Sequence, residues 1–66
     1  MIVTVNGVRR EVEEGLSVAA LVDDLAGGTR GTAVAVNQEV VPRSTWASTR
    51  LQPGDAVELL RAAQGG

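Results

Sequence analysis

The 66-residue sequence contains no cysteine and no histidine, and these two absences exclude most kinds of catalytic or metal site. Without cysteine the chain cannot form a disulfide, offer a thiol nucleophile or hold an iron–sulfur cluster. Without histidine it also lacks the common zinc ligand and the side chain that most often acts as a general base near neutral pH. We therefore expect no metal site and no catalysis by this chain alone.

Lysine is absent as well, and the six basic residues are all arginines scattered along the chain. The terminal amine of Met1 is then the only primary amine, which makes the chain a poor acceptor for an isopeptide bond. The formal net charge is −2, and dispersed arginines in an acidic protein do not form a phosphate-binding surface. We expect no nucleic acid partner.

Long apolar runs are missing too, since none approaches the roughly 20 residues that a membrane-spanning helix needs. Residues 1–5 lack the basic region and cleavage site of a signal peptide. We therefore expect a cytoplasmic protein without a membrane partner. A chain of this length forms one domain with a small core, which leaves no room for a large substrate pocket.

The start of the sequence predicts an antiparallel β-hairpin. Asn6-Gly7 separates two β-prone runs, and both residues accept the positive φ of a two-residue hairpin turn. We interpret this pair, like Pro53-Gly54, as a turn and nothing more. The apolar side chains that alternate along the two strands are expected to face inward: Met1, Val3 and Val5, then Val8 and Val12.

Residues 17–26 predict one amphipathic helix. Ser17 can cap its N-terminus, and Gly27 can adopt the left-handed conformation that ends many helices. Apolar residues repeat at i, i+3, i+4 and i+7, so one face is expected to be buried. That face holds Val18, Leu21, Val22 and Leu25, while Asp23 and Asp24 are expected to face water.

The second half of the sequence predicts further strands. A β-branched run at 32–36 is followed by a short edge strand at Val40-Val41, which Pro42 closes. Residues 44–50 predict a short helical turn. After the type II turn at Pro53-Gly54, the last strand directs Val57 and Leu59 inward and Leu60 outward.

These elements define an α+β fold in which a mixed sheet of about four to five strands packs on the helix at about 17–26. The helix must bury its apolar stripe, and the sheet offers the only apolar face that can cover it. This is the β-grasp layout. We expect a domain at 1–61, monomeric when free, and a flexible tail at 62–66 that reaches roughly 17 Å when extended.

The tail ends in Gly65-Gly66, the residues that are hardest to order, so the pair does not serve the fold. Chance or an expression scar are two explanations. A third is a terminus that partner enzymes handle, because glycines without Cβ atoms let partner walls close around the backbone.

A β-grasp domain with a Gly-Gly terminus resembles ubiquitin and its prokaryotic relatives, and among these the ThiS family of sulfur carriers. The matching stretches "VNG", "EGLSVAALVDDL", "AVAVNQEVVPRSTW", "PGD" and "QGG" span nearly the whole chain. The most specific part is Asn37 with Val41-Pro42-Arg43 and Trp46. One departure is Ala62-Ala63 before Gln64, where many relatives carry a larger aliphatic side chain.

The resemblance implies that a ThiF-like enzyme uses ATP to adenylate the carboxylate of Gly66. Sulfur from a persulfide donor then gives a thiocarboxylate, which passes its sulfur to a ThiG-like thiazole synthase. The chain itself binds no cofactor and is not an enzyme. Two alternatives stay open: a carrier for another pathway, such as MoaD-like molybdopterin or cysteine synthesis, and a ubiquitin-like modifier or interaction domain.

Candidate partner-binding residues follow from the same resemblance. Large aromatic side chains anchor interfaces, yet Trp46 is the single aromatic residue and is at least as suited to covering the core. An exposed Leu60 beside the tail is a docking candidate. Arg43 and Arg61 could pair with acidic partner surfaces near the tail, although isolated surface arginines usually stay solvated. The full set is Gly65, Gln64, Leu60, Arg61, Arg43 and Trp46.

Overall fold

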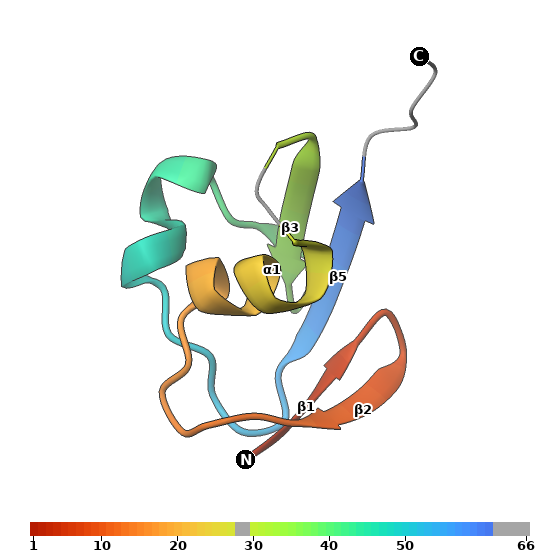
Figure 1. Cartoon of the computed structure of the whole chain (residues 1–66). Helices are drawn as coiled ribbons and strands as arrows, with labels where there is room; N and C mark the ends of the chain where they lie inside the picture. The colour runs from red at the N-terminus through yellow and green to blue at the C-terminus, as the bar shows by residue number, and fades with distance from the viewer. Residues whose placement is uncertain (28–29, 62–66) are drawn as a thin grey trace.

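The computed structural model describes residues 1–27 and 30–61, so the tail predicted at 62–66 lies outside the described residues. Figure 1 shows one helix lying across a sheet. The elements are β1 (Ile2–Val5), β2 (Val8–Glu11), α1 (Val18–Ala26), β3 (Thr32–Val36), β4 (Glu39–Val40), the 3₁₀ helix η1 (Arg43–Ser48) and β5 (Ala56–Arg61).

The five strands form one mixed sheet in the order β2-β1-β5-β3-β4. β5 comes last in the sequence but lies at the centre, parallel to β1 and antiparallel to β3. The two outer pairs, β1 with β2 and β3 with β4, are antiparallel. This arrangement, with one helix on one face, is the ubiquitin-like β-grasp fold and confirms the predicted fold class.

Helix α1 begins and ends where the sequence predicts. The Oγ of Ser17 accepts a hydrogen bond from the N–H of Ala20 at 3.1 Å, and Gly27 ends the helix with a φ of 70°. A glycine suits this position because a left-handed backbone crowds any Cβ atom. Of the predicted stripe, Val18, Leu21 and Val22 are buried, and Leu25 is half-buried.

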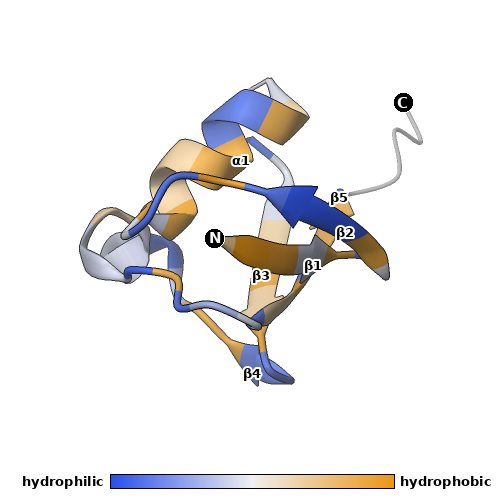
Figure 2. Ribbon diagram, turned by 90° about the horizontal axis from the view of Figure 1, so that it is seen from below, coloured by the Kyte–Doolittle hydropathy of each residue, from blue (hydrophilic) through white to orange (hydrophobic). Residues whose placement is uncertain are grey.

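The core lies between α1 and one face of the sheet. Figure 2 shows β1 in hydrophobic colours beside a largely hydrophilic β2, as expected for an inner strand next to an edge strand. Alternate strand residues face the helix, and Leu51 from the segment before β5 is also buried. The sheet contributes Val3, Val5, Val34 and Val57 to this core.

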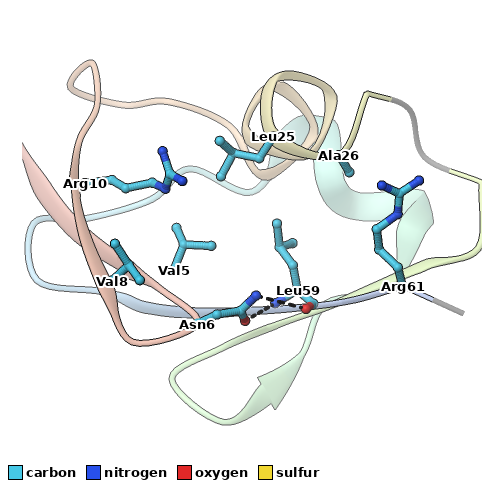
Figure 3. Close-up of a pocket in the computed structure, with 8 residues that line it drawn as sticks. All are labelled: Val5, Asn6, Val8, Arg10, Leu25, Ala26, Leu59 and Arg61. Carbon is cyan, nitrogen blue, oxygen red and sulfur yellow. Dashed lines mark hydrogen bonds between the residues drawn. The ribbon is translucent and has the colours of Figure 1, made fainter. Parts of the chain in front are cut away.

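Val8 lies on the predicted face of the sheet, but it is not buried there. Val8 pairs with Val5 and so lies on the helix side of the sheet, but its side chain is 58% exposed. Every residue of β2 is exposed, because this edge strand has a neighbour on one side only and lies across a groove from α1 (Figure 3). Val12, just past the strand, is half-buried against the core as expected.

Trp46 is a core residue. Its side chain is only 3% exposed, and its indole N–H donates a hydrogen bond of 2.8 Å to the carbonyl of Val41. A buried indole needs such a partner, because an unpaired buried N–H would be destabilising. The structure therefore assigns Trp46 to the fold, and leaves its ring almost no surface for a partner.

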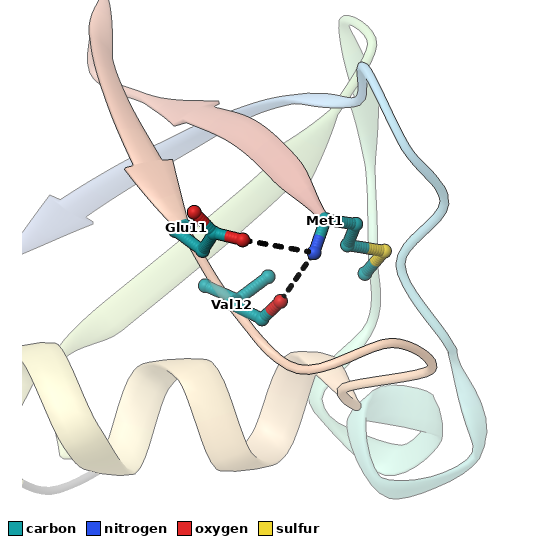
Figure 4. Close-up of polar contacts among 3 residues, drawn as sticks. All are labelled: Met1, Glu11 and Val12. Atoms are coloured by element: carbon teal, nitrogen blue, oxygen red, sulfur yellow. Dashed lines mark hydrogen bonds and ion pairs between the residues drawn. The ribbon is translucent and has the colours of Figure 1, made fainter.

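The terminal amine of Met1 links the start of β1 to the end of β2. Its ammonium group donates a hydrogen bond of 2.7 Å to the carbonyl of Val12 and lies 3.9 Å from a carboxylate oxygen of Glu11 (Figure 4). The Val12 N–H donates in return to the Met1 carbonyl at 2.8 Å. The chain's one primary amine is thus bound to its own backbone.

Replacing Ser17 tests how much the helix cap contributes. Ser17→Ala removes the acceptor for the Ala20 N–H and is expected to lower the free energy of unfolding by about 1 kcal/mol. Ser17→Gly should lower it by only a few tenths, since glycine is tolerated at a cap. Urea unfolding followed by the fluorescence of Trp46 measures both, and equal losses would contradict a capping role.

Candidate functional site

The candidate site is the end of β5, where the sequence leads toward Gly66. Arg61 is the last described residue, and Gly66 follows five residues later. The predicted site residues Gln64, Gly65 and Gly66 lie outside the described residues. What the structure does show is the surface from which this segment continues.

The residues of β5 alternate between the two faces of the sheet as predicted. Val57 is buried, and Leu59 is half-buried against the same core. Leu60 points the other way and is 69% exposed, opposite Ala33 on β3. Leu60 therefore lies on the outer face of the sheet, the face away from α1.

Three of the predicted partner-binding residues lie around one hollow of about 410 Å³ at the end of β5. We call it the outer hollow. Leu60 and Arg61 reach it from β5, and Arg43 reaches it from the first residue of η1. The guanidinium carbon of Arg43 also lies 6.0 Å from the ring centre of the buried Trp46. Gly31, Thr32 and Ala33 complete the lining.

A second hollow of about 300 Å³ opens between the hairpin and the C-terminal end of α1. Figure 3 shows apolar side chains between two arginines, Arg10 and Arg61. Arg61 therefore lines a hollow on each side of β5. The apolar lining consists of Val5, Val8, Leu25, Ala26 and Leu59.

The residues around these two hollows are suited to binding a partner rather than to catalysis. Their charged groups are guanidinium groups, and no carboxylate lines either of them. Among residues 1–27 and 30–61, no group of three or more acidic, histidine or cysteine residues could hold a metal ion. No helix in the same ranges is long and apolar enough to cross a membrane. The site suits a partner surface that offers carboxylates and apolar side chains.

The sequence interpretation missed a second role of Asn6. Asn6 does form the predicted turn, with a φ of 52°, but its side chain also binds the backbone of Leu59 on β5 (Figure 3). The prediction that Asn6-Gly7 is only a turn is therefore wrong. No signal in the sequence links the two residues, because Leu59 follows Asn6 by 53 positions.

Comparison with known proteins places this geometry in a family. The sequence profile of the ThiS family matches residues 3–66. The sulfur carrier protein ThiS of Escherichia coli is 38% identical over 52 residues, which cover 79% of each chain. The crystal structure of the thiamine biosynthesis protein ThiS from Geobacter metallireducens matches with a TM-score of 0.83 and 36% identity, over all of both chains.

A further relative is much longer. A thiazole synthase of Paramagnetospirillum magneticum is 33% identical over all 66 residues of this chain, which spans only 20% of that protein. Sequence and fold agree in these comparisons, since the profile covers nearly the whole chain and the solved structure is superposable over its full length. This chain therefore belongs to the ThiS family.

Proposed function

We propose that Gly66 is the residue on which this ThiS family member, a sulfur carrier of thiamine biosynthesis, holds its sulfur. The observation that carries the proposal is the family match, which runs from residue 3 to residue 66 and so includes the Gly65-Gly66 pair. The described surface supports it, because the end of β5 presents contact groups but no catalytic constellation. Chemistry at Gly66 must then be supplied by partner enzymes.

The first step activates the carboxylate of Gly66, because a carboxylate is a poor electrophile. One carboxylate oxygen attacks the α-phosphorus of ATP, pyrophosphate leaves, and an acyl-adenylate forms. A ThiF-like enzyme binds the ATP, and this chain supplies only the carboxylate. A location in the cytoplasm, where ATP is available, is part of the same proposal.

The second step introduces the sulfur. The terminal sulfur of a persulfide donor attacks the acyl carbon, AMP leaves, and the carrier is joined to the donor by an acyl disulfide. A thiol then attacks the donor's sulfur atom, so that the thiocarboxylate leaves and the donor ends in a disulfide. Because this chain has no cysteine, both the persulfide and the thiol must come from partners.

The acceptor of the sulfur is a thiazole synthase of the ThiG type. The thiazole synthase of Paramagnetospirillum magneticum supports this assignment, because a fifth of that protein is similar to the whole of this chain. A carrier-like segment and a synthase in one polypeptide support a role of the two in the same reaction. The proposed contact between this chain and a synthase of that type is docking.

Docking is proposed to use the outer hollow, with Arg43, Leu60 and Arg61 as the contacts. Leu60 offers an exposed apolar side chain next to the segment that must enter the partner. The two guanidinium groups can each bind a carboxylate, and can do so with two hydrogen bonds. Association costs translational and rotational freedom, so contacts made by the folded body have to supply part of the affinity.

Intact mass spectrometry tests the site of the chemistry. The full chain, incubated with a ThiF-like enzyme, ATP, a persulfide source and a thiol, is expected to gain the mass difference between one sulfur and one oxygen atom. A chain that lacks Gly66 is expected to gain nothing. Adding a thiazole synthase with its sugar-phosphate substrate should return the full chain to its original mass.

Failure of the full chain to gain mass, with an enzyme that activates another carrier, would refute the proposal. Adducts on lysines of other proteins would instead indicate a ubiquitin-like modifier. Transfer of sulfur to a molybdopterin or cysteine precursor, but not to thiazole, would identify a carrier of another pathway.

Leu60→Ala tests the docking surface. We expect the Kd for the activating enzyme to rise roughly 5- to 30-fold, the effect of losing about 1–2 kcal/mol at an interface. The melting temperature should not change, because Leu60 is 69% exposed. Val40→Ala is the matched control, since Val40 is 74% exposed on the same face but lies on the edge strand β4. Equal effects of both variants on Kd would exclude Leu60 as a specific contact.

A further inference from the structure

The last strand is paired unequally on its two sides. On one side, β3 pairs with β5 from Val57 through Arg61. On the other side, β1 pairs with β5 only at Ala56 and Val57, because the chain leaves β1 for the hairpin turn at Asn6. Beyond Val57, β5 therefore has no backbone neighbour on the β1 side within the described residues.

The side chain of Asn6 takes the place of the missing strand. The backbone N–H of Asn6 donates to the Val57 carbonyl at 2.9 Å, the last hydrogen bond between the two backbones. One step further, the side-chain oxygen of Asn6 accepts from the Leu59 N–H at 2.9 Å, and its amide nitrogen donates to the Leu59 carbonyl at 3.3 Å. A side-chain amide thus pairs with both backbone groups of Leu59, as a strand residue would.

A matching asparagine holds the other end of β5. Asn37 also has a φ of 52° in a hairpin turn, and its side-chain oxygen accepts from the Ala56 N–H at 3.0 Å. Its amide nitrogen donates to the Asp55 carboxylate at 3.0 Å. β5 is therefore bound at its beginning and near its end by asparagines with the same positive φ.

We propose that Asn6 is a positioning residue for sulfur transfer: it fixes the end of β5, and so the point from which the segment bearing Gly66 leaves the domain. The inference rests on the proposed function of Gly66. Arg61 lies two residues beyond Leu59 and β1 does not extend to it, so within the described residues the bonds from Asn6 to Leu59 are the last attachment on this side.

Two consequences follow if Leu59 is released. Each residue that leaves the sheet moves the last fixed residue about 3.3–3.6 Å of chain further from Gly66, so the reach from the docked body to the carboxylate is no longer set. Leu60 and Arg61 would then be held by β3 alone, so their orientation in the outer hollow is less firmly fixed. A partner enzyme would then have to order these residues on docking, which weakens binding before any chemistry occurs.

Asn6→Gly and Asn37→Gly form a matched pair of variants. Glycine accepts the positive φ at each position, so both turns should form. Each variant removes one side chain that binds one end of β5. Both should fold, with similar decreases in melting temperature. They differ in which end of β5 is released, as amide hydrogen exchange should show: faster exchange at Leu59 in the first variant and at Ala56 in the second.

The decisive measurement is pyrophosphate release by a ThiF-like enzyme with the carrier as the varied substrate. For Asn6→Gly we expect the KM for the carrier to rise about five- to tenfold, the effect of two hydrogen bonds, with kcat nearly unchanged. Asn37→Gly should keep the KM of the original chain. Asn6→Asp keeps the acceptor for the Leu59 N–H, so its KM should lie between those of the original chain and Asn6→Gly.

A KM that stays the same in Asn6→Gly, or rises equally in Asn37→Gly, would overturn the proposal, because only general stability would then be involved. If the enzyme releases no pyrophosphate with the original chain as its substrate, the proposed function fails instead. In that case the exchange of the Leu59 amide still decides whether Asn6 holds the end of β5.

Discussion

The central position of β5 is the constraint on which the rest of the structure depends. β5, the last strand in the sequence, has to insert between β1 and β3, because neither of those strands pairs with the other. Until it does, the hairpin and the β3–β4 pair belong to separate halves and α1 has no complete surface to cover. Completing this sheet requires contacts between the two ends of the chain, and such non-local contacts form slowly.

That constraint also bears on the proposed site of sulfur transfer. Because β5 is central, its end is bound by β3 on one side and by Asn6 on the other. The segment that follows Arg61 therefore starts from a well-held part of the sheet. The proposed transfer at Gly66 would use this combination: a firmly attached base for docking, followed by the segment that holds Gly65-Gly66.

The small size of the domain and its missing residue types fit the proposal that partner enzymes supply the chemistry. The domain has no cysteine, histidine or lysine, so it offers no nucleophilic side chain of those kinds that could react with an activated carboxyl group. Its amine at Met1 is bound to the Val12 carbonyl. The arginines that line the two hollows supply charge for recognition, and a guanidinium group stays protonated and unreactive.

The sequence alone determined the features that depend on neighbours along the chain. Ser17 and Gly27 limit the helix, the alternation of Leu59 and Leu60 assigns the two sheet faces, and Gly65-Gly66 indicates a carrier, because caps, strand alternation and motifs are local properties. Only the tertiary structure decided the roles that need distant partners. It buried Trp46, left Val8 exposed on an edge strand, gathered Arg43 with Leu60 and Arg61, and joined Asn6 to Leu59. The order of the strands brings these residues together, and no local pattern in the sequence records that order.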